Sequence, residues 1–194
     1  MYDILVNICS TTVAYALGCL TTGYYLVRSR IGSDVRSTGS GSVGATNVGR
    51  LIGNHGFVLT FFGDLSKGVL ALLLAKWSGC QNPWLALVVL SVVVGHVWPM
   101  QLKFNGGKGV ATTMGGLLVQ NPLLTLILMG VFGVFYSMCR DRGASGIAVF
   151  MCLPLFALLF ERSIGVSVVY LALASLLIWT HRNTLVLLTR AKTN

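Results

Sequence analysis

Long apolar runs are the feature that most limits what this chain can fold into. Residues 4–27, 56–77 and 84–102 are predominantly apolar, and each is long enough to cross a hydrocarbon core of about 30 Å as a helix. Only 10% of the 194 residues are charged, too few to cover the surface of a soluble domain of this size. The sequence therefore predicts an all-α polytopic integral membrane protein, with residues 1–194 in a single membrane-embedded domain.

Four further apolar segments complete the chain. They cover residues 110–119, 123–138, 147–160 and 164–179. The sequence Gln-Asn-Pro at 120–122 separates segment 110–119 from segment 123–138. We expect these two segments to form a helical hairpin or a short tilted pair. The chain is thus predicted to contain about seven transmembrane or re-entrant helices.

The distribution of Lys and Arg indicates the orientation of these segments. The net charge is +9, and the cations flank the apolar runs, which favours orientation and attraction of anionic lipid or substrate over nucleic-acid binding. With the N-terminus outside and seven segments, eleven of the 14 cations lie on the inner side. If residues 110–138 formed one helix, the C-terminal cations would lie outside and the excess of Lys and Arg on the inner side would be lost. We expect an outside N-terminus, a cytoplasmic C-terminus, and either seven segments or five spans with a re-entrant pair.

Two glycine-rich stretches face the cytoplasm in this topology. One reads S-T-G-S-G-S-V-G-A-T-N-V-G-R at 37–50, and the other reads K-F-N-G-G-K-G-V-A-T-T at 103–113. Glycine lets backbone N–H groups approach an anion closely, and Arg or Lys supplies the opposite charge. The apolar segment from 110 could start a helix whose N-terminal dipole adds to this attraction. Together the stretches favour phosphate binding over the alternative of a tight turn and a flexible loop.

Several other chemistries lack their motifs in this sequence. Neither glycine-rich stretch fits G-x-x-x-x-G-K-[ST], and the nucleophile elbow G-x-S-x-G and the zinc motif H-E-x-x-H do not occur. No His is followed five positions later by Asp, so the His-x4-Asp dyad of other glycerolipid acyltransferases is missing. The sequence predicts neither a metal site nor a cofactor.

Five motifs follow one another along nearly the whole chain. They are S-G-S-V-G-A-T-N at 40–47, G-D-L-S-K-G at 63–68, G-H-V-W-P at 95–99, K-F-N-G-G-K-G-V-A-T at 103–112 and H-R-N at 181–183. This combination resembles the PlsY family, which are bacterial integral-membrane glycerol-3-phosphate acyltransferases. The resemblance implies transfer of a fatty acyl group from acyl phosphate to the 1-hydroxyl of glycerol 3-phosphate, giving lysophosphatidate and phosphate. It also implies a multi-pass protein of the bacterial cytoplasmic (inner) membrane.

The resemblance assigns roles to individual residues. The expected catalytic residues are Ser40, Arg50, His96 and Lys108, and the expected substrate-binding residues are Gly41, Gly44, Thr46, Asn47, Lys67, Gly106, Gly107 and Asn183. Ser40, Thr46, Asn47 and Arg50 would contact phosphate. The N–H groups of Gly106 and Gly107, with Lys108, would hold the other phosphate or the charge that develops on the acyl oxygen.

Two further roles concern the second and third motifs. His96 would bind glycerol 3-phosphate and help with its hydroxyl proton; the alternative is a helix-end histidine that caps a carbonyl. Asp64 and Lys67 would pair inside the membrane and support the site. Because acyl phosphate is already activated, a substrate phosphate could accept the proton, and no protein nucleophile is required. An acyl-enzyme on Ser40 is the competing mechanism.

The chain departs from the family pattern at three places. Ser42-Val43 replaces the usual Asn-Pro, Asn105 replaces a lysine, and Thr184 stands where an asparagine is usual, with Asn183 one position early. These departures keep a diverged acyltransferase with another acceptor among the alternatives. A transporter of an organic phosphate is another, although we find no internal repeat and the polar groups cluster at one face. A membrane scaffold would leave the glycine-rich stretches unexplained.

Overall fold

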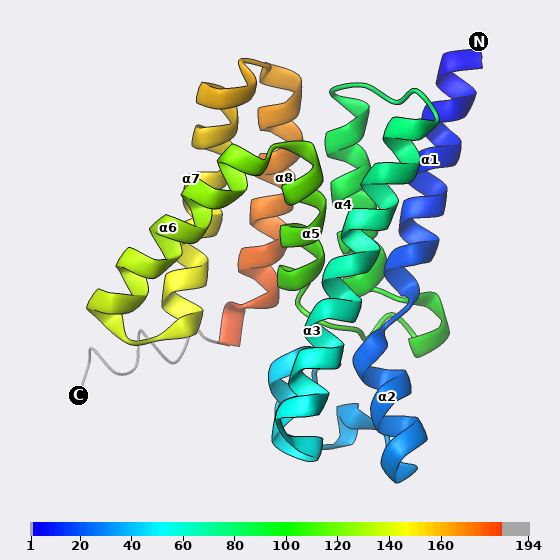
Figure 1. Ribbon diagram of the computed structural model, residues 1–194, viewed down its shortest axis with the longest axis vertical. Coiled ribbons are helices and arrows are strands. Elements are labelled where there is room, and N and C mark those ends of the chain that lie inside the picture. Colours follow the sequence, from blue (N-terminus) through cyan, green and yellow to red (C-terminus); the bar gives the residue numbers. More distant parts are fainter. Residues whose placement is uncertain (1, 184–194) are drawn as a thin grey trace. The chain divides into compact units, whose positions relative to one another are not determined.

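The computed structural model describes residues 2–183, and all regular structure within that range is helical (Figure 1). The α-helices are α1 (Tyr2–Cys19), α2 (Thr22–Ile31), α3 (Ala45–Trp77), α4 (Trp84–Val97), α5 (Val110–Gln120), α6 (Pro122–Cys139), α7 (Arg142–Glu161) and α8 (Ile164–Thr180), with 3₁₀ turns η1 (Val35–Ser37) and η2 (Met100–Leu102). Five stretches are long and apolar enough to cross a membrane, namely Asp3–Ile31, Ala45–Trp77, Trp84–Leu102, Pro122–Cys139 and Arg142–Glu161. The prediction of an all-helical membrane protein is confirmed at this level.

Side-chain caps set the starts of the later helices. Asn121 accepts a hydrogen bond from the N–H of Leu124 and is followed by Pro122 in the first turn of α6, so the predicted interruption after α5 is confirmed. Asp141 and Ser163 cap α7 and α8 in the same way, each accepting from the N–H three residues later. Each of these capping residues stands immediately before the helix that it starts.

The chain forms two compact units, residues 1–120 and 121–194. In the second unit, α7 packs against both α6 and α8. Leu153 and Ala157 of α7 and Tyr170 and Leu173 of α8 are almost fully buried there. The single domain expected from the sequence stays a prediction.

Glycines let the helices of the first unit pack closely. Gly18 of α1 lies against the carbonyl of Val92 in α4, and Gly95 of α4 lies against the carbonyl of Tyr15 in α1. A methyl group at either glycine would collide with backbone, so only glycine permits this approach. The pair α3–α5 repeats the arrangement, with Gly68 against Thr112 and Gly115 against Leu65.

Two helix breaks differ from the sequence prediction. The first apolar run does not stay one helix, because α1 ends at Cys19 and α2 starts at Thr22. The second span begins at Ala45, inside the glycine-rich stretch and before its predicted start at residue 56, and is broken at Ile52 and Gly53. Gly53 has φ +78°, which is the left-handed region that glycine enters without steric cost. The short first part of α3 therefore carries Arg50 at the end of the glycine-rich stretch.

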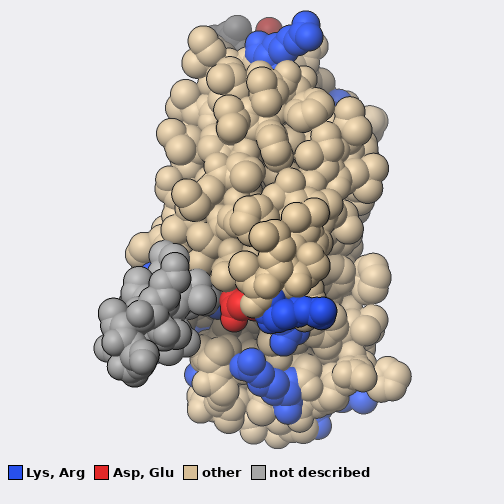
Figure 2. Space-filling model, turned by 90° about the vertical axis from the view of Figure 1, so that its left-hand side faces the viewer, with Lys and Arg blue, Asp and Glu red and all other residues tan. Residues whose placement is uncertain are grey.

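The surface is consistent with a lipid environment. Figure 2 shows a broad area without charged side chains, with Lys and Arg gathered beyond its two ends. On α3, Leu59, Phe62 and Leu70 are each at least half exposed. In water such an apolar surface would be costly, whereas lipid tails solvate it.

Candidate active site

The loop after α2 and the turn after α4 lie together at one end of the first unit (Figure 1). Arg36 joins them, because its Nη1 donates to the carbonyl of Leu102 at 2.7 Å. The same guanidinium pairs with Asp34 at 2.7 Å and lies over the ring of Tyr24. The carboxylate of Asp34 raises the pKa of Arg36, so this link stays charged. The buried side chains below it are Val27, Val35, Val43, Val48 and Leu102.

Asn47 organises the first glycine-rich stretch from inside. Its side chain is 2% exposed, and its Oδ1 accepts from the N–H of Ser40 at 3.0 Å. Its Nδ2 lies 2.9–3.1 Å from the carbonyl oxygens of Val35, Thr38 and Ser42. The amide is therefore committed to the loop backbone. Direct phosphate contact by Asn47, as predicted, would require it to give up these bonds.

The loop around Asn47 needs glycine at two positions. Gly39 and Gly41 have φ of +60° and +69°, and a side chain on Gly39 would strike the amide of Asn47. Ser40 lies exposed between them. Gly44 is the N-cap residue of α3, so Ser40, Gly41 and Gly44 surround the start of that helix. Thr46 and Arg50 are exposed in its first turns.

The second glycine-rich stretch runs back along the end of α4. Lys103 and Phe104 both have positive φ, which reverses the chain after η2. The N–H of Gly106 then donates to the carbonyl of Val97, and the N–H of Gly107 donates to the carbonyl of His96, both at 3.0 Å. For these two N–H groups to hold an anion, as predicted, their bonds to α4 would have to break. These bonds fix the course of the chain up to Lys108.

Arg50 and Lys108 are brought together from different segments. Lys108 is half-buried, and burial together with the charge of Arg50 lowers its pKa below the ordinary lysine value. α5 starts two residues later at Val110, which confirms the helix predicted there. The unpaired N–H groups of its first turn carry partial positive charge. Two cations and a helix N-terminus are thus concentrated in this part of the first unit.

Behind this loop lies a buried polar network. The ammonium of Lys67 on α3 is 3.1 Å from a carboxylate oxygen of Asp64, which confirms the predicted pair. The same ammonium is 3.0 Å from the carbonyl oxygens of Gly18 and Leu20 and 2.7 Å from Nδ1 of His96. It therefore holds the carbonyls that the break between α1 and α2 leaves without helical partners.

The network determines the tautomer of His96 and the position of its ring. Because the Lys67 ammonium donates to Nδ1, the neutral imidazole carries its proton on Nε2. His96 is 3% exposed, and its Nε2 side packs against Gly107, where any side chain would collide with the ring. Direct contact of His96 or Lys67 with a substrate, as predicted, would require the Gly106–Gly107 backbone or the network to move.

The remaining predicted residue is Asn183. Asn183 is exposed and belongs to the second unit, so its contribution stays a prediction, and Thr184 is outside the described residues. Sequence reasoning missed Asp34 and Arg36, whose only sequence signal was charge in a loop otherwise rich in Gly and Ser. Among residues 2–183, no group of three His, Cys, Asp or Glu side chains could hold a metal ion.

Comparisons with known proteins agree on one family. The family model for glycerol-3-phosphate acyltransferase matches residues 8–191. A glycerol-3-phosphate acyltransferase 1 of Desulfitobacterium hafniense is 42% identical over 176 residues, which is 89% of this chain and 85% of the relative. The glycerol-3-phosphate acyltransferase of Clostridioides difficile is 36% identical and aligns over 93% of this chain and 90% of its own.

Solved structures give the same result. The crystal structure of PlsY, an integral membrane glycerol 3-phosphate acyltransferase, in its glycerol 3-phosphate form has a TM-score of 0.87 at 32% identity. It covers 95% of this chain and 92% of that one. The lysophosphatidic acid form has a TM-score of 0.84 at 30% identity over the same shares.

Proposed function

The chain belongs to the glycerol-3-phosphate acyltransferase family and is an acyltransferase, and we propose that its acyl donor is acyl phosphate and its acceptor the 1-hydroxyl of glycerol 3-phosphate. The observation that carries this proposal is the convergence of Arg50, Lys108 and the N-terminus of α5. Both substrates bear phosphate, which suits that concentration of positive charge. The donor also carries an acyl chain, which suits a site on a membrane-spanning unit.

The proposed reaction needs no protein nucleophile. The oxygen of the 1-hydroxyl attacks the acyl carbon of acyl phosphate, the new ester C–O bond forms, and the bond from the acyl carbon to the phosphate oxygen breaks. The proton of the hydroxyl passes to phosphate, which leaves as inorganic phosphate. Lys108 and Arg50 bind the phosphates and stabilise the negative charge that develops on the acyl oxygen. Ser40 and Thr46, exposed beside the start of α3, donate hydrogen bonds to a phosphate.

Other residues of the predicted set act in this proposal through the backbone. Asn47 shapes the turn that contains Ser40 and Gly41, with Gly44 at the helix start. Lys67 and His96 position Gly106 and Gly107, and hence Lys108, since the imidazole packs against Gly107. They are positioning residues in this scheme.

The proposed setting is the bacterial cytoplasmic membrane. The N-terminus lies outside and the C-terminus inside, and the shorter helices α5 and α8 bring the total of transmembrane or re-entrant segments to seven. Support comes from the five apolar spans and from the positions of Lys and Arg relative to them. Glycine-rich loops on the inner side would meet soluble glycerol 3-phosphate there.

Turnover by purified protein tests the donor and the site together. We expect palmitoyl phosphate with glycerol 3-phosphate to give lysophosphatidate and one phosphate per turnover, and palmitoyl-CoA to give neither. Arg50→Ala and Lys108→Ala should each reduce kcat/KM at least 100-fold, as for loss of a charged group that contacts the transition state. Both products are measured with and without glycerol 3-phosphate. Phosphate release at the same rate in its absence would contradict this acceptor.

Lys103 provides the matched control. It is an exposed lysine in the same loop as Lys108, and both Lys and Ala face the same positive φ there. Lys103→Ala should stay within about threefold of wild type, the range of a lost surface charge. Equal losses in Lys103→Ala and Lys108→Ala, or normal rates in Lys108→Ala and Arg50→Ala, would reject the assigned site.

A further inference from the structure

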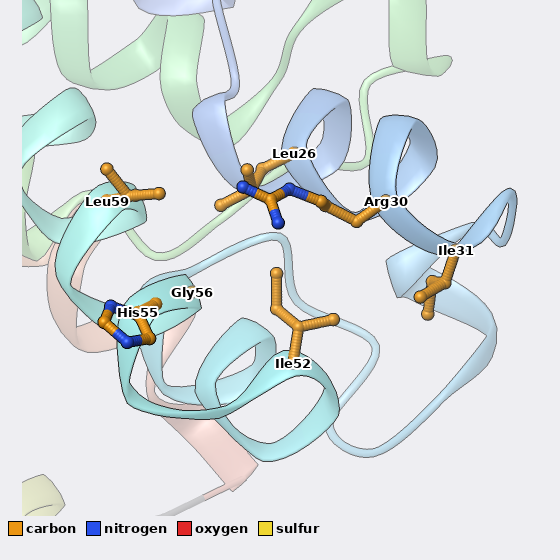
Figure 3. A pocket seen from close by; sticks show the side chains of 7 residues that line it. All are labelled: Leu26, Arg30, Ile31, Ile52, His55, Gly56 and Leu59. Atoms are coloured by element: carbon orange, nitrogen blue, oxygen red, sulfur yellow. The ribbon is translucent and has the colours of Figure 1, made fainter.

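A pocket with basic side chains lies in the first unit, between α2 and α3 (Figure 3). Its volume is about 500 Å³, and its lining residues are Leu26, Arg30, Ile31, Ile52, His55, Gly56 and Leu59. None of these belongs to the residues assigned above to acyl transfer. The pocket is therefore distinct from the proposed site of acyl transfer.

Within residues 2–183, the two basic side chains of this pocket have no protein partners. Arg30 reaches across from α2 between Leu26 and Ile52, and His55 stands on the wall formed by α3 (Figure 3). Among the described residues, neither side chain makes a hydrogen bond, ion pair or ring contact. The neighbouring Arg28, by contrast, donates to the carbonyl of Gly32 at 2.6 Å. An arginine extended over a pocket without a carboxylate partner leaves its guanidinium donors for an external anion.

The rest of the lining is aliphatic or glycine and belongs to two of the apolar spans. Ile31 and Leu59 are each 50% exposed, so the pocket is open to its surroundings rather than sealed. Arg30 lies at the end of the apolar span Asp3–Ile31, and Leu59 lies within the span Ala45–Trp77. A phospholipid placed here would meet the Arg30 guanidinium and the His55 imidazole with its headgroup and aliphatic side chains with its tails. A small soluble anion would use only the cationic part.

We propose that this pocket binds an anionic phospholipid of the surrounding bilayer. The phosphate would contact Arg30 and His55. The part of the acyl tails nearest the headgroup would pack against Leu26, Ile52 and Leu59. Charge complementarity selects the anionic headgroup, and the aliphatic lining selects a lipid. Ile52 is one of the two residues at which α3 breaks, and the part of α3 before the break carries Arg50. A bound lipid would therefore hold the break next to the segment that binds phosphate.

Native mass spectrometry of delipidated protein can measure this binding directly. The probes are phosphatidylglycerol and phosphatidylcholine with identical acyl chains. Wild type should bind phosphatidylglycerol in preference. Arg30→Gln should weaken phosphatidylglycerol binding about fivefold, the contribution of one cation near an anionic lipid. His55→Gln should weaken it less, because Gln retains a hydrogen-bond donor.

Arg28→Gln is the matched control, since it removes an exposed arginine from the same helix outside the pocket. It should leave the lipid preference unchanged. Equal loss in Arg28→Gln and Arg30→Gln, or equal binding of the two lipids by wild type, would overturn the proposal. If Arg30→Gln fails to give monodisperse protein, Arg30→Lys is measured instead. It keeps the charge and should keep the preference for phosphatidylglycerol. Loss of that preference in Arg30→Lys would also contradict the proposal.

A last arm separates a bilayer lipid from the acyl donor. A long-chain alkylphosphonate, which mimics acyl phosphate but cannot transfer an acyl group, is added to Lys108→Ala protein loaded with phosphatidylglycerol. We expect it not to displace the lipid. Displacement that depends on Arg30 would show that the pocket serves the donor and would overturn the assignment to a membrane lipid. The outcome is independent of turnover and so does not depend on the proposed reaction.

Discussion

Asn47 shows how a single buried amide can shape a glycine-rich loop through bonds to its backbone. One oxygen accepts from Ser40, and one nitrogen lies against three carbonyl oxygens. The carbonyls need a donor at this position, and an aspartate would place negative charge against them. Residue 47 therefore needs an amide that both donates and accepts; a carboxylate of the same size would not serve.

We expect Asn47→Asp to destabilise the protein by about 2–4 kcal/mol, because it replaces several donated hydrogen bonds with unsatisfied buried acceptors. Thermal unfolding in detergent measures the loss. Asn54→Asp makes the same chemical change at an exposed position of α3 and should cost less than about 0.5 kcal/mol. If the two substitutions have equal effects, Asn47 does not organise the loop.

Lys108 gives the site a pH dependence. Its pKa is lowered from 10.5 by burial and by Arg50, so on raising the pH it loses its proton before an ordinary lysine does. Since phosphate binding needs the protonated form, kcat/KM should fall as pH rises through this lowered value. Bound phosphate stabilises the cation and raises the pKa, so the fall in kcat should come at higher pH.

Lys108→Arg tests this assignment, because guanidinium stays protonated throughout the range. The alkaline fall of kcat/KM should disappear in this variant, at a lower overall rate since the planar group differs in shape from ammonium. Rates are corrected for spontaneous hydrolysis of acyl phosphate at each pH. An unchanged alkaline limb in Lys108→Arg would assign the titration to another group.

At the scale of helices, Lys67 ties three elements together. From α3 its ammonium reaches Asp64, the carbonyls at the end of α1 and His96 on α4. His96 in turn packs against Gly107, which precedes Lys108. One buried charge thus bonds to the carbonyls at the break between α1 and α2. Through His96 it also supports the glycine-rich stretch that carries Lys108.

Lys67→Met should destabilise the fold by about 3–5 kcal/mol, because it leaves Asp64 as an unpaired buried carboxylate. The double substitution Asp64→Asn/Lys67→Met removes both charges and should regain much of the stability. Its kcat should stay low with KM for glycerol 3-phosphate little changed, because His96 and the loop remain unanchored. Thermal unfolding and steady-state kinetics measure the two effects, and full recovery of kcat would limit the pair to a structural role.

For the whole molecule, orientation in the membrane decides which compartment supplies the substrate. Polar connections of the first unit alternate between its two ends, with residues 32–44 and 103–109 at one end and 78–83 at the other (Figure 1). The distribution of Lys and Arg predicts that the first two connections are cytoplasmic. Five native cysteines must be replaced before labelling can test this.

In the cysteine-free protein, single cysteines at Asn105 and Gln81 should label from opposite sides of intact cells. Gln81→Cys should react with an impermeant maleimide, and Asn105→Cys should react only after permeabilisation. Both positions are exposed, so accessibility to solvent does not distinguish them. The reverse labelling pattern would invert the topology and separate the glycine-rich loops from cytoplasmic glycerol 3-phosphate.

The sequence by itself determined the class, the family and most helix ends. Apolar length predicts spans because the bilayer sets a minimum length for a helix. Gln-Asn-Pro predicts the start of α6 because a cap and a proline act within one turn. The five motifs indicate glycerol-3-phosphate acyltransferase because they report residue identity at short spacings. Each of these inferences uses only neighbours in the chain.

The tertiary structure decided which groups are free to act. Lys67 and His96 are 29 residues apart, and Arg36 and Leu102 are 66 apart, yet both pairs are joined by hydrogen bonds. The sequence could not reveal that the N–H groups of Gly106 and Gly107 are bonded to α4, or that Lys67 bonds to the carbonyls at the break in the first span. A hydrogen-bonding group can satisfy only a few partners, and packing between distant segments determines which partners those are.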